Sequence, residues 1–174
     1  MKNCISVLSF LLFNTFVFCQ SNLDYMQAGM GSFFKRDYNT AISYLTKEIS
    51  RRDKNSYPAA LTFRGQSKYA IGDYAGAVSD YDKAIDFVQI NPLSFFYRGM
   101  AKAKLQDFKG AIADYTTCIN TITDDLRQYR SAAFLNRGFA RINSGNKHDG
   151  CTDLRTAGEL GEKEAFAYIK QYCN

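Results

Sequence analysis

The sequence predicts an all-α fold: a superhelix of about four antiparallel helical hairpins, followed by one further helix. Three observations predict it. A segment of the 174-residue chain repeats without gaps at a shift of 34 residues. Apolar residues recur at helical spacing within each half of the repeat. Proline, aspartate and glycine stand where helices of this length would begin and end.

The repeat is clearest in the middle of the chain, where residues 65–84 align with residues 99–118. The matching pairs are Arg64-Gly65 with Arg98-Gly99, Asp73-Tyr74 with Asp107-Phe108, Gly76-Ala77 with Gly110-Ala111, and Asp80-Tyr81 with Asp114-Tyr115. Weaker copies lie around Gly29 and Gly138. One hairpin cannot bury its apolar face alone, so the hairpins must stack and share a continuous core.

Helix signals place the elements in order along residues 20–174. We expect hairpins over about residues 22–55, 58–91, 92–125 and 131–161, and a capping helix over residues 162–173. First helices begin near Pro58 and Pro92, and Gly72 ends one of them. The second helices are capped by Asp37, Asp73 and Asp107. Extra residues within 120–130 predict a longer helix or connection before the fourth hairpin.

Residues 1–19 predict a signal peptide that is cleaved after Cys19. Lys2 is followed by an apolar run of about 14 residues, which is shorter than the roughly 20 residues of a membrane-spanning helix. The mature domain, residues 20–174, is then secreted or periplasmic, without a transmembrane segment and with a net charge of +4 instead of +5. The alternatives are a membrane anchor and a lipoprotein lipidated on Cys19, although the bulky Phe18 argues against lipidation.

The chain resembles the tetratricopeptide repeat (TPR) family, in its secreted bacterial type, over about residues 22–162. The resemblance rests on a large residue, a glycine four positions later, and a small residue further on. The large residues are Tyr25, Leu61, Phe95 and Phe134; the glycines are Gly29, Gly65, Gly99 and Gly138; the small residues are Ala41, Ala77, Ala111 and Gly150. It implies a right-handed α-α superhelix whose first helices line a concave groove for partner peptides.

The groove positions of the family fall on mostly apolar residues here. They include Met26, Met30, Phe33, Phe34, Tyr69, Phe96, Met100, Leu135 and Phe139, with Leu23, Thr62, Gln66, Lys104 and Asn143 beside them. Each can either contact a partner or pack against the next hairpin, and both possibilities stay open. If exposed, they predict an apolar or extended peptide partner. Some TPR co-chaperones clamp a C-terminal carboxylate with polar and basic groove residues. The corresponding positions here hold Met26, Met30, Phe63, Leu93 and Tyr97, so binding of that type is not expected.

Arginine and aspartate recur together in three of the four repeats. Arg64, Arg98 and Arg137 precede the repeat glycine, and Asp80, Asp114 and Asp153 each follow their arginine by 16 residues. The first repeat has neither partner, which favours an Arg–Asp bridge within each hairpin. The alternative is an arginine ladder that binds phosphate or acidic peptides. Lys68, Lys102 and Arg141 also repeat, and we expect them to form a solvated ridge.

The remaining reactive side chains predict structure and no catalysis. Cys151 and Cys173 are expected to form a disulfide between two antiparallel helices, and the alternative is two separate buried thiols. Cys118 stands where other repeats carry alanine, so we expect a small core residue. His148 has no orienting group nearby, and neither a zinc spacing nor a phosphate loop is present.

The sequence therefore predicts a non-catalytic scaffold of the cell envelope or exterior that binds another protein or a peptide, without metal or cofactor. The alternatives are a structural subunit of an envelope complex and a binder of anionic polymers. Nucleic acid is not an expected partner, because much of the positive charge is assigned to internal pairs.

Overall fold

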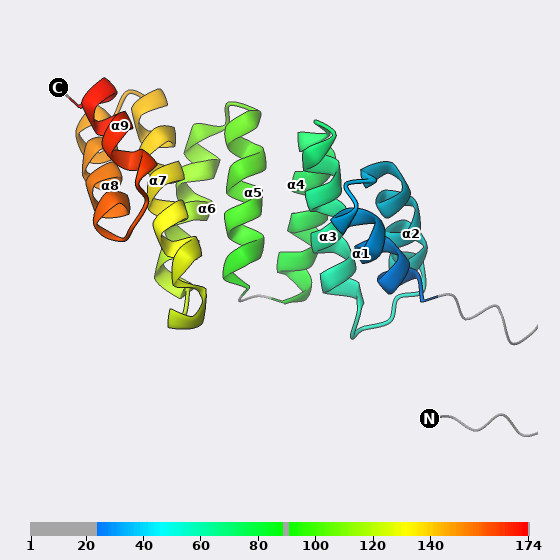
Figure 1. Cartoon of the computed structure of the whole chain (residues 1–174). Helices are drawn as coiled ribbons and strands as arrows, with labels where there is room; N and C mark the ends of the chain where they lie inside the picture. The colour runs from blue at the N-terminus through cyan, green and yellow to red at the C-terminus, as the bar shows by residue number, and fades with distance from the viewer. Residues whose placement is uncertain (1–23, 89–90, 174) are drawn as a thin grey trace, which may run out of the picture.

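The computed structural model describes residues 24–88 and 91–173, which form nine α-helices and one 3₁₀ turn, without a strand (Figure 1). Four antiparallel hairpins follow one another: α1 (Tyr25–Phe34) with α2 (Tyr38–Ser50), α3 (Tyr57–Ala70) with α4 (Tyr74–Phe87), α5 (Pro92–Lys104) with α6 (Phe108–Thr121), and α7 (Arg127–Asn143) with α8 (Lys147–Glu159). A final helix, α9 (Glu164–Tyr172), packs on α8. The predicted all-α hairpin solenoid is confirmed.

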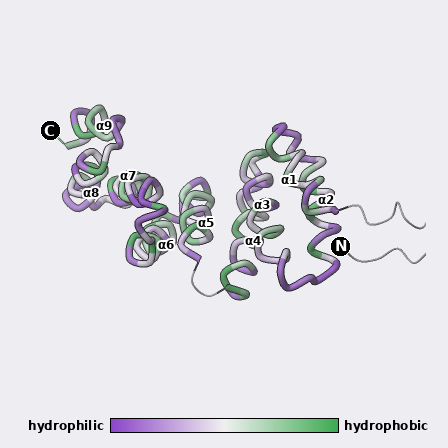
Figure 2. The backbone as a smooth tube through the Cα atoms, turned by 60° about the horizontal axis from the view of Figure 1, so that its bottom comes forward, coloured by the Kyte–Doolittle hydropathy of each residue, from purple (hydrophilic) through white to green (hydrophobic). Residues whose placement is uncertain are grey.

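The hairpins stack in chain order. The second helix of each hairpin contacts the first helix of the next, through α2 and α3, α4 and α5, and α6 and α7. Figure 2 shows the helices more nearly end on, with α1, α3, α5 and α7 on one side of the stack. None of the described helices has the length and apolar character needed to cross a membrane. The predicted signal peptide lies outside the described residues.

Polar side chains cap the second helices as expected. The carboxylates of Asp37, Asp73 and Asp107 accept a hydrogen bond from the backbone N–H three residues later, at 3.2, 2.8 and 2.9 Å. Asn146 caps α8 in the same way. Pro58 and Pro92 lie in the first turn of α3 and α5, where a missing N–H removes no helical hydrogen bond.

Each hairpin turns through one residue in the left-handed backbone region. Gly72 and Gly145 occupy this place in the second and fourth hairpins, with φ of 88° and 91°. Arg36 and Gln106 occupy it in the first and third, with φ of 62° and 63°. A side chain is disfavoured there, so these two hairpins fold with a local conformational cost.

The connection before the fourth hairpin contains both of the expected forms of insertion. A 3₁₀ turn, η1 (Asp124–Leu126), precedes α7, and α7 extends over 17 residues.

The repeat glycines allow close contact between the two helices of each hairpin. A Cβ atom placed on Gly65 or Gly99 would lie 2.8 or 2.9 Å from the Cε1 atom of Tyr81 or Tyr115. In the fourth hairpin the backbones themselves meet, because a Cβ on Gly138 would lie 2.9 Å from the carbonyl oxygen of Gly150. Small residues therefore set the spacing within the hairpins, and aromatic rings fill the space beside them.

Candidate functional site

Three hollows lie in a row along the first helices. The N-terminal hollow, 440 Å³, is lined by Phe33, Phe34, Ala59, Thr62, Phe63, Gln66, Asn91, Leu93, Tyr97 and Tyr129. The central hollow, 190 Å³, is lined by Phe33, Tyr38, Gln66, Tyr69, Ala70, Tyr81, Tyr97 and Met100. The C-terminal hollow, 220 Å³, is lined by Tyr69, Met100, Ala103, Lys104, Phe108, Tyr115, Asn136, Phe139, Ala140 and Asn143.

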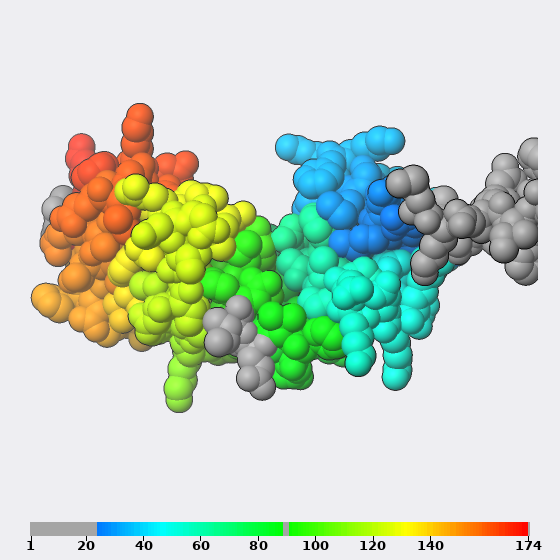
Figure 3. Space-filling view, turned by 90° about the horizontal axis from the view of Figure 1, so that it is seen from below, coloured from blue at the N-terminus to red at the C-terminus, as the bar shows by residue number. Residues whose placement is uncertain are grey.

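Shared side chains join the hollows into one groove. Phe33, Gln66 and Tyr97 border both the N-terminal and the central hollow. Tyr69 and Met100 border both the central and the C-terminal hollow. Figure 3 shows the outline of the molecule dipping between its N-terminal end and its C-terminal end, over the green middle repeats.

Nine of the predicted groove residues line these hollows: Phe33, Phe34, Thr62, Gln66, Tyr69, Met100, Lys104, Phe139 and Asn143. Phe34 is 69% exposed, the largest exposed fraction among the large apolar side chains of the described residues. Met30 and Leu135 are half-buried and lie outside the three hollows.

Two predicted groove residues pack inward. Phe96 is 6% exposed, so of the two possibilities left open for it the structure shows packing against the neighbouring hairpin. Its ring contacts Tyr115 of α6 and Tyr129 of α7, with centroids 6.0 and 5.6 Å apart, and thus seals the interface between two hairpins. Met26 packs against the core around Leu45.

Sequence reasoning missed the contribution of the second helices. Tyr38 and Phe108 are the first residues of α2 and α6, and both line the groove. Tyr81 and Tyr115, further along α4 and α6, line it as well. The sequence feature that could have indicated Tyr38 and Phe108 is their place directly after the capping aspartates Asp37 and Asp107.

The aromatic side chains that line the N-terminal hollow pack against one another. The rings of Phe33 and Phe34 lie edge-on against Phe63, with centroids 5.4 and 6.2 Å apart. The hydroxyls of Tyr97 and Tyr129 lie 3.4 Å apart. Such edge-to-face pairs are favourable and hold rings in defined orientations.

The groove lining carries almost no charge. Among the described residues, no carboxylate lines any of the three hollows, and Lys104 is the one cation in their lining. The amide nitrogens of Asn136 and Asn143 donate to the carbonyls of Ala132 and Phe139, both at 2.8 Å. These amides retain further hydrogen-bonding capacity for a ligand.

The three Arg–Asp pairs are present, each bidentate. Nε and Nη2 of the arginine donate to the two oxygens of the aspartate, at 2.8 and 2.6 Å for Arg64–Asp80, 2.9 and 2.6 Å for Arg98–Asp114, and 2.9 and 2.8 Å for Arg137–Asp153. The aspartates are at most 3% exposed. A bidentate pair inside each hairpin joins its two helices.

The expected solvated ridge of Lys68, Lys102 and Arg141 is wrong. Each of these cations approaches the same buried aspartate as the arginine of its hairpin, at 2.9, 2.8 and 2.8 Å. Their side chains are 18–23% exposed. A single buried carboxylate between two cations is the reason why these positions recur.

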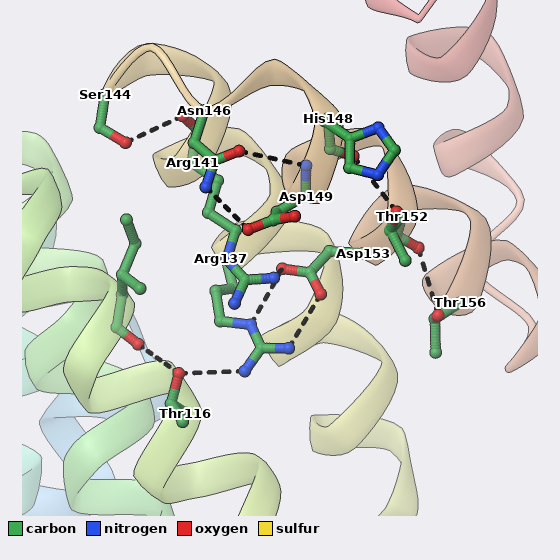
Figure 4. A network of polar contacts seen from close by, with 11 residues as sticks. Thr116, Arg137, Arg141, Ser144, Asn146, His148, Asp149, Thr152, Asp153 and Thr156 are labelled. Atoms are coloured by element: carbon green, nitrogen blue, oxygen red, sulfur yellow. Dashed lines mark hydrogen bonds and ion pairs between the residues drawn. The ribbon is translucent and has the colours of Figure 1, made fainter.

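The arginines also connect neighbouring hairpins. Their Nη1 atoms donate to Thr46, Asp82 and Thr116 on the second helix of the preceding hairpin, at 3.0, 2.7 and 3.0 Å. Figure 4 shows Arg137 between Asp153 and Thr116, with Arg141 reaching the same carboxylate. With their polar edges occupied in this way, the arginines give no support to a phosphate-binding ladder.

The first hairpin replaces this cluster with aromatic contacts. Tyr25 and Tyr44 stack with ring centroids 6.3 Å apart, and Lys47 and Arg51 lie over the Tyr25 ring.

The cysteines have structural positions. Cys151 and Cys173 form a disulfide that ties the end of α9 to α8. Cys118 is fully buried, and burial raises the pKa of its thiol to about 11, which keeps it in the unreactive protonated form at neutral pH. His148 is exposed, and the described residues contain no cluster of side chains that could hold a metal ion.

No protein-family model and no curated protein matches the chain. Solved structures do match. MamA aligns with a TM-score of 0.72 and 20% identity over 86% of this chain and 85% of that one. A tetratricopeptide repeat protein from Parabacteroides merdae aligns with a TM-score of 0.68 and 20% identity over 80% and 53%.

The second TPR domain of the human RPAP3 protein, solved in complex with an HSP70 peptide, aligns with a TM-score of 0.59 and 28% identity, over 67% of this chain and 98% of that one. The matches agree with the repeated glycines, the paired helices and the stacking of the hairpins. The chain therefore has the fold of the tetratricopeptide repeat proteins.

Proposed function

We propose that the chain is a non-catalytic scaffold that binds an extended peptide segment of a partner protein in its concave groove. The observation that carries the proposal is the continuity of the three hollows along α1, α3, α5 and α7. Apolar and aromatic side chains with a few amides and hydroxyls are the typical lining of a peptide-binding surface.

The RPAP3 domain supports the proposal, because a solved relative in fold holds a peptide. The positions of a carboxylate clamp are apolar in this chain, and Phe63, Leu93 and Tyr97 line the N-terminal hollow instead. The segment that fits this hollow therefore carries apolar side chains and not a C-terminal carboxylate.

The proposal is tested with short random peptides that are selected for binding to the protein by display. Phe34→Ala and Met100→Ala remove groove contacts and should weaken binding of the selected peptides about tenfold or more. Leu160→Ala is the matched control, because Leu160 is 40% exposed at the end of α8 and outside the groove.

Unfolding temperatures measured in parallel should stay close to that of the wild type for Phe34→Ala and Leu160→Ala, and should fall modestly for Met100→Ala, because Met100 also packs against the core. Binding that depends on Leu160 and on neither groove residue would contradict the proposal. That result would favour the alternative, a structural subunit joined through an end of the solenoid.

We also propose that the scaffold works outside the cytoplasm, as a secreted or periplasmic protein. The apolar N-terminal run supports this, and so does the Cys151–Cys173 disulfide, because disulfides persist in oxidising compartments. Mass analysis of the protein from its native cells should find an N-terminus at Gln20. An intact Met1 in the cytoplasmic fraction would contradict this location. A lipid on Cys19 would show that the mature protein is anchored to a membrane and not released.

A further inference from the structure

Tyr81 and Tyr115 stand at places where the fold does not need a hydroxyl. Each follows the aspartate of an Arg–Asp pair and packs its ring on the repeat glycine, Gly65 or Gly99. In the first and fourth hairpins, Leu45 and Leu154 occupy the same place and are fully buried. Packing therefore accounts for a large apolar group at this place and leaves the tyrosine hydroxyl without an explanation.

Neither hydroxyl has a hydrogen-bond partner among residues 24–88 and 91–173, although both side chains are only 1% exposed. A buried polar group without a partner costs about 1–3 kcal/mol. Among the described residues, two side-chain polar atoms are fully enclosed and have no hydrogen-bond partner: Ser94 Oγ and Arg130 Nε. Neither tyrosine hydroxyl is among these enclosed atoms, so each keeps a small accessible surface, and the two residues line the central and C-terminal hollows.

The two hydroxyls serve adjacent parts of one groove. Tyr81 lines the central hollow and Tyr115 the C-terminal hollow, and Tyr69 and Met100 border both. Burial raises the pKa of both hydroxyls above the usual value of tyrosine, so they remain neutral O–H donors at physiological pH.

A neutral acceptor matches such donors best. An extended peptide presents main-chain carbonyls at regular intervals along its length, and burying a hydrogen-bonded carbonyl costs far less than burying a charge. Apolar walls beside the hydroxyls would hold the side chains of the same segment, as in a mostly apolar site with a few placed polar groups.

We propose that Tyr81 and Tyr115 are peptide-binding residues whose hydroxyls donate hydrogen bonds to main-chain carbonyls of a segment that crosses the central and C-terminal hollows. This assignment rests on the proposed groove function and names the two side chains that orient the ligand backbone.

The test compares Tyr81→Phe, Tyr115→Phe and the double variant with the wild type, using the display-selected peptides as probes. Each single change should weaken binding about threefold to tenfold, the effect of one neutral hydrogen bond, and the double change more. The unfolding temperature should stay equal or rise, because an unpaired buried hydroxyl is removed. Tyr57→Phe is the control, since Tyr57 contacts Phe87 away from the groove.

Three results would overturn the inference. If the phenylalanine variants bind as the wild type does while Met100→Ala weakens binding, the hydroxyls do not contact the ligand and the groove function still holds. If the phenylalanine variants lose stability, the hydroxyls serve the fold. If no groove variant affects binding, the proposed function fails as well.

Discussion

Asp114 shows how a residue that repeats along the chain can control stability. Asp114 accepts two hydrogen bonds from Arg98 and forms an ion pair with Lys102, and only 3% of its surface is exposed. Asp82 also pairs with Arg98, but its side chain is half exposed. Breaking a buried pair leaves charge without compensation, whereas a surface pair contributes little.

We therefore expect Asp114→Ala to lower the free energy of unfolding by about 3 kcal/mol, since it leaves two cations facing each other in a hairpin. Asp82→Ala should cost only about 0.5 kcal/mol. Urea unfolding of both variants measures the difference. Equal effects of the two changes would mean that the three-residue cluster does not hold the hairpin together.

The turn residues offer a second prediction at this scale. Gln106 has a φ of 63° at the place where Gly72 and Gly145 turn the other hairpins. Gln106→Gly should raise the free energy of unfolding by about 0.5–1 kcal/mol, because glycine tolerates this conformation. Gly72→Ala should lower it by a similar amount, although open space surrounds that Cβ position. Thermal unfolding measures both, and a change of the same sign would contradict the explanation.

At the scale of elements, α9 depends on few contacts. Ala165 is its one buried residue, and Phe166 is 60% exposed. Two contacts hold α9 in place. The ring of Tyr168 packs against the ring of Phe139, with centroids 4.4 Å apart, and Cys173 forms the disulfide with Cys151. The hydroxyl of Ser131 on α7 also donates to Glu162, in the turn before α9. Since Phe139 lines the C-terminal hollow, α9 supports one end of the groove.

Replacing both Cys151 and Cys173 with serine should lower the stability of the C-terminal end by about 3 kcal/mol, the chain-entropy contribution of a bond that closes 22 residues. Amide hydrogen exchange should then accelerate in α9 and leave α3–α6 close to their wild-type rates. Unchanged protection of α9 would show that packing alone holds this helix.

The elements could be predicted because their signals are local. Capping aspartates, prolines and repeat glycines fix where helices begin, end and touch, and each acts within a few residues of its own position. The Arg–Asp pairs were accessible because their joint presence and joint absence follow the repeat. The role of Lys68 was missed, since a repeated lysine looks the same whether its ammonium faces solvent or a buried carboxylate.

The groove could be predicted only in part for a different reason. Whether Phe96 faces solvent depends on how two hairpins pack against each other, and its contacts with Tyr115 and Tyr129 arise from that packing. The hydroxyls of Tyr81 and Tyr115 are likewise visible as unpaired groups only when the whole core is present. Local periodicity carries neither piece of information.

At the scale of the whole molecule, the solenoid separates two kinds of surface. The polar clusters bind the hairpins to each other and pair six cations with three buried aspartates, while the concave side keeps aromatic and apolar side chains accessible across all four repeats. A surface of this shape is preformed, so little ordering is required when a segment binds.

Site-specific photocrosslinking in the native cell tests the groove most directly. A photoreactive residue is placed at Met100, between the central and C-terminal hollows, or at Lys83, an exposed residue of α4 outside the groove. Crosslinks to a partner segment should form from position 100 and should be outcompeted by the display-selected peptides, with none from position 83. Crosslinks from position 83 alone would contradict the groove as the binding surface.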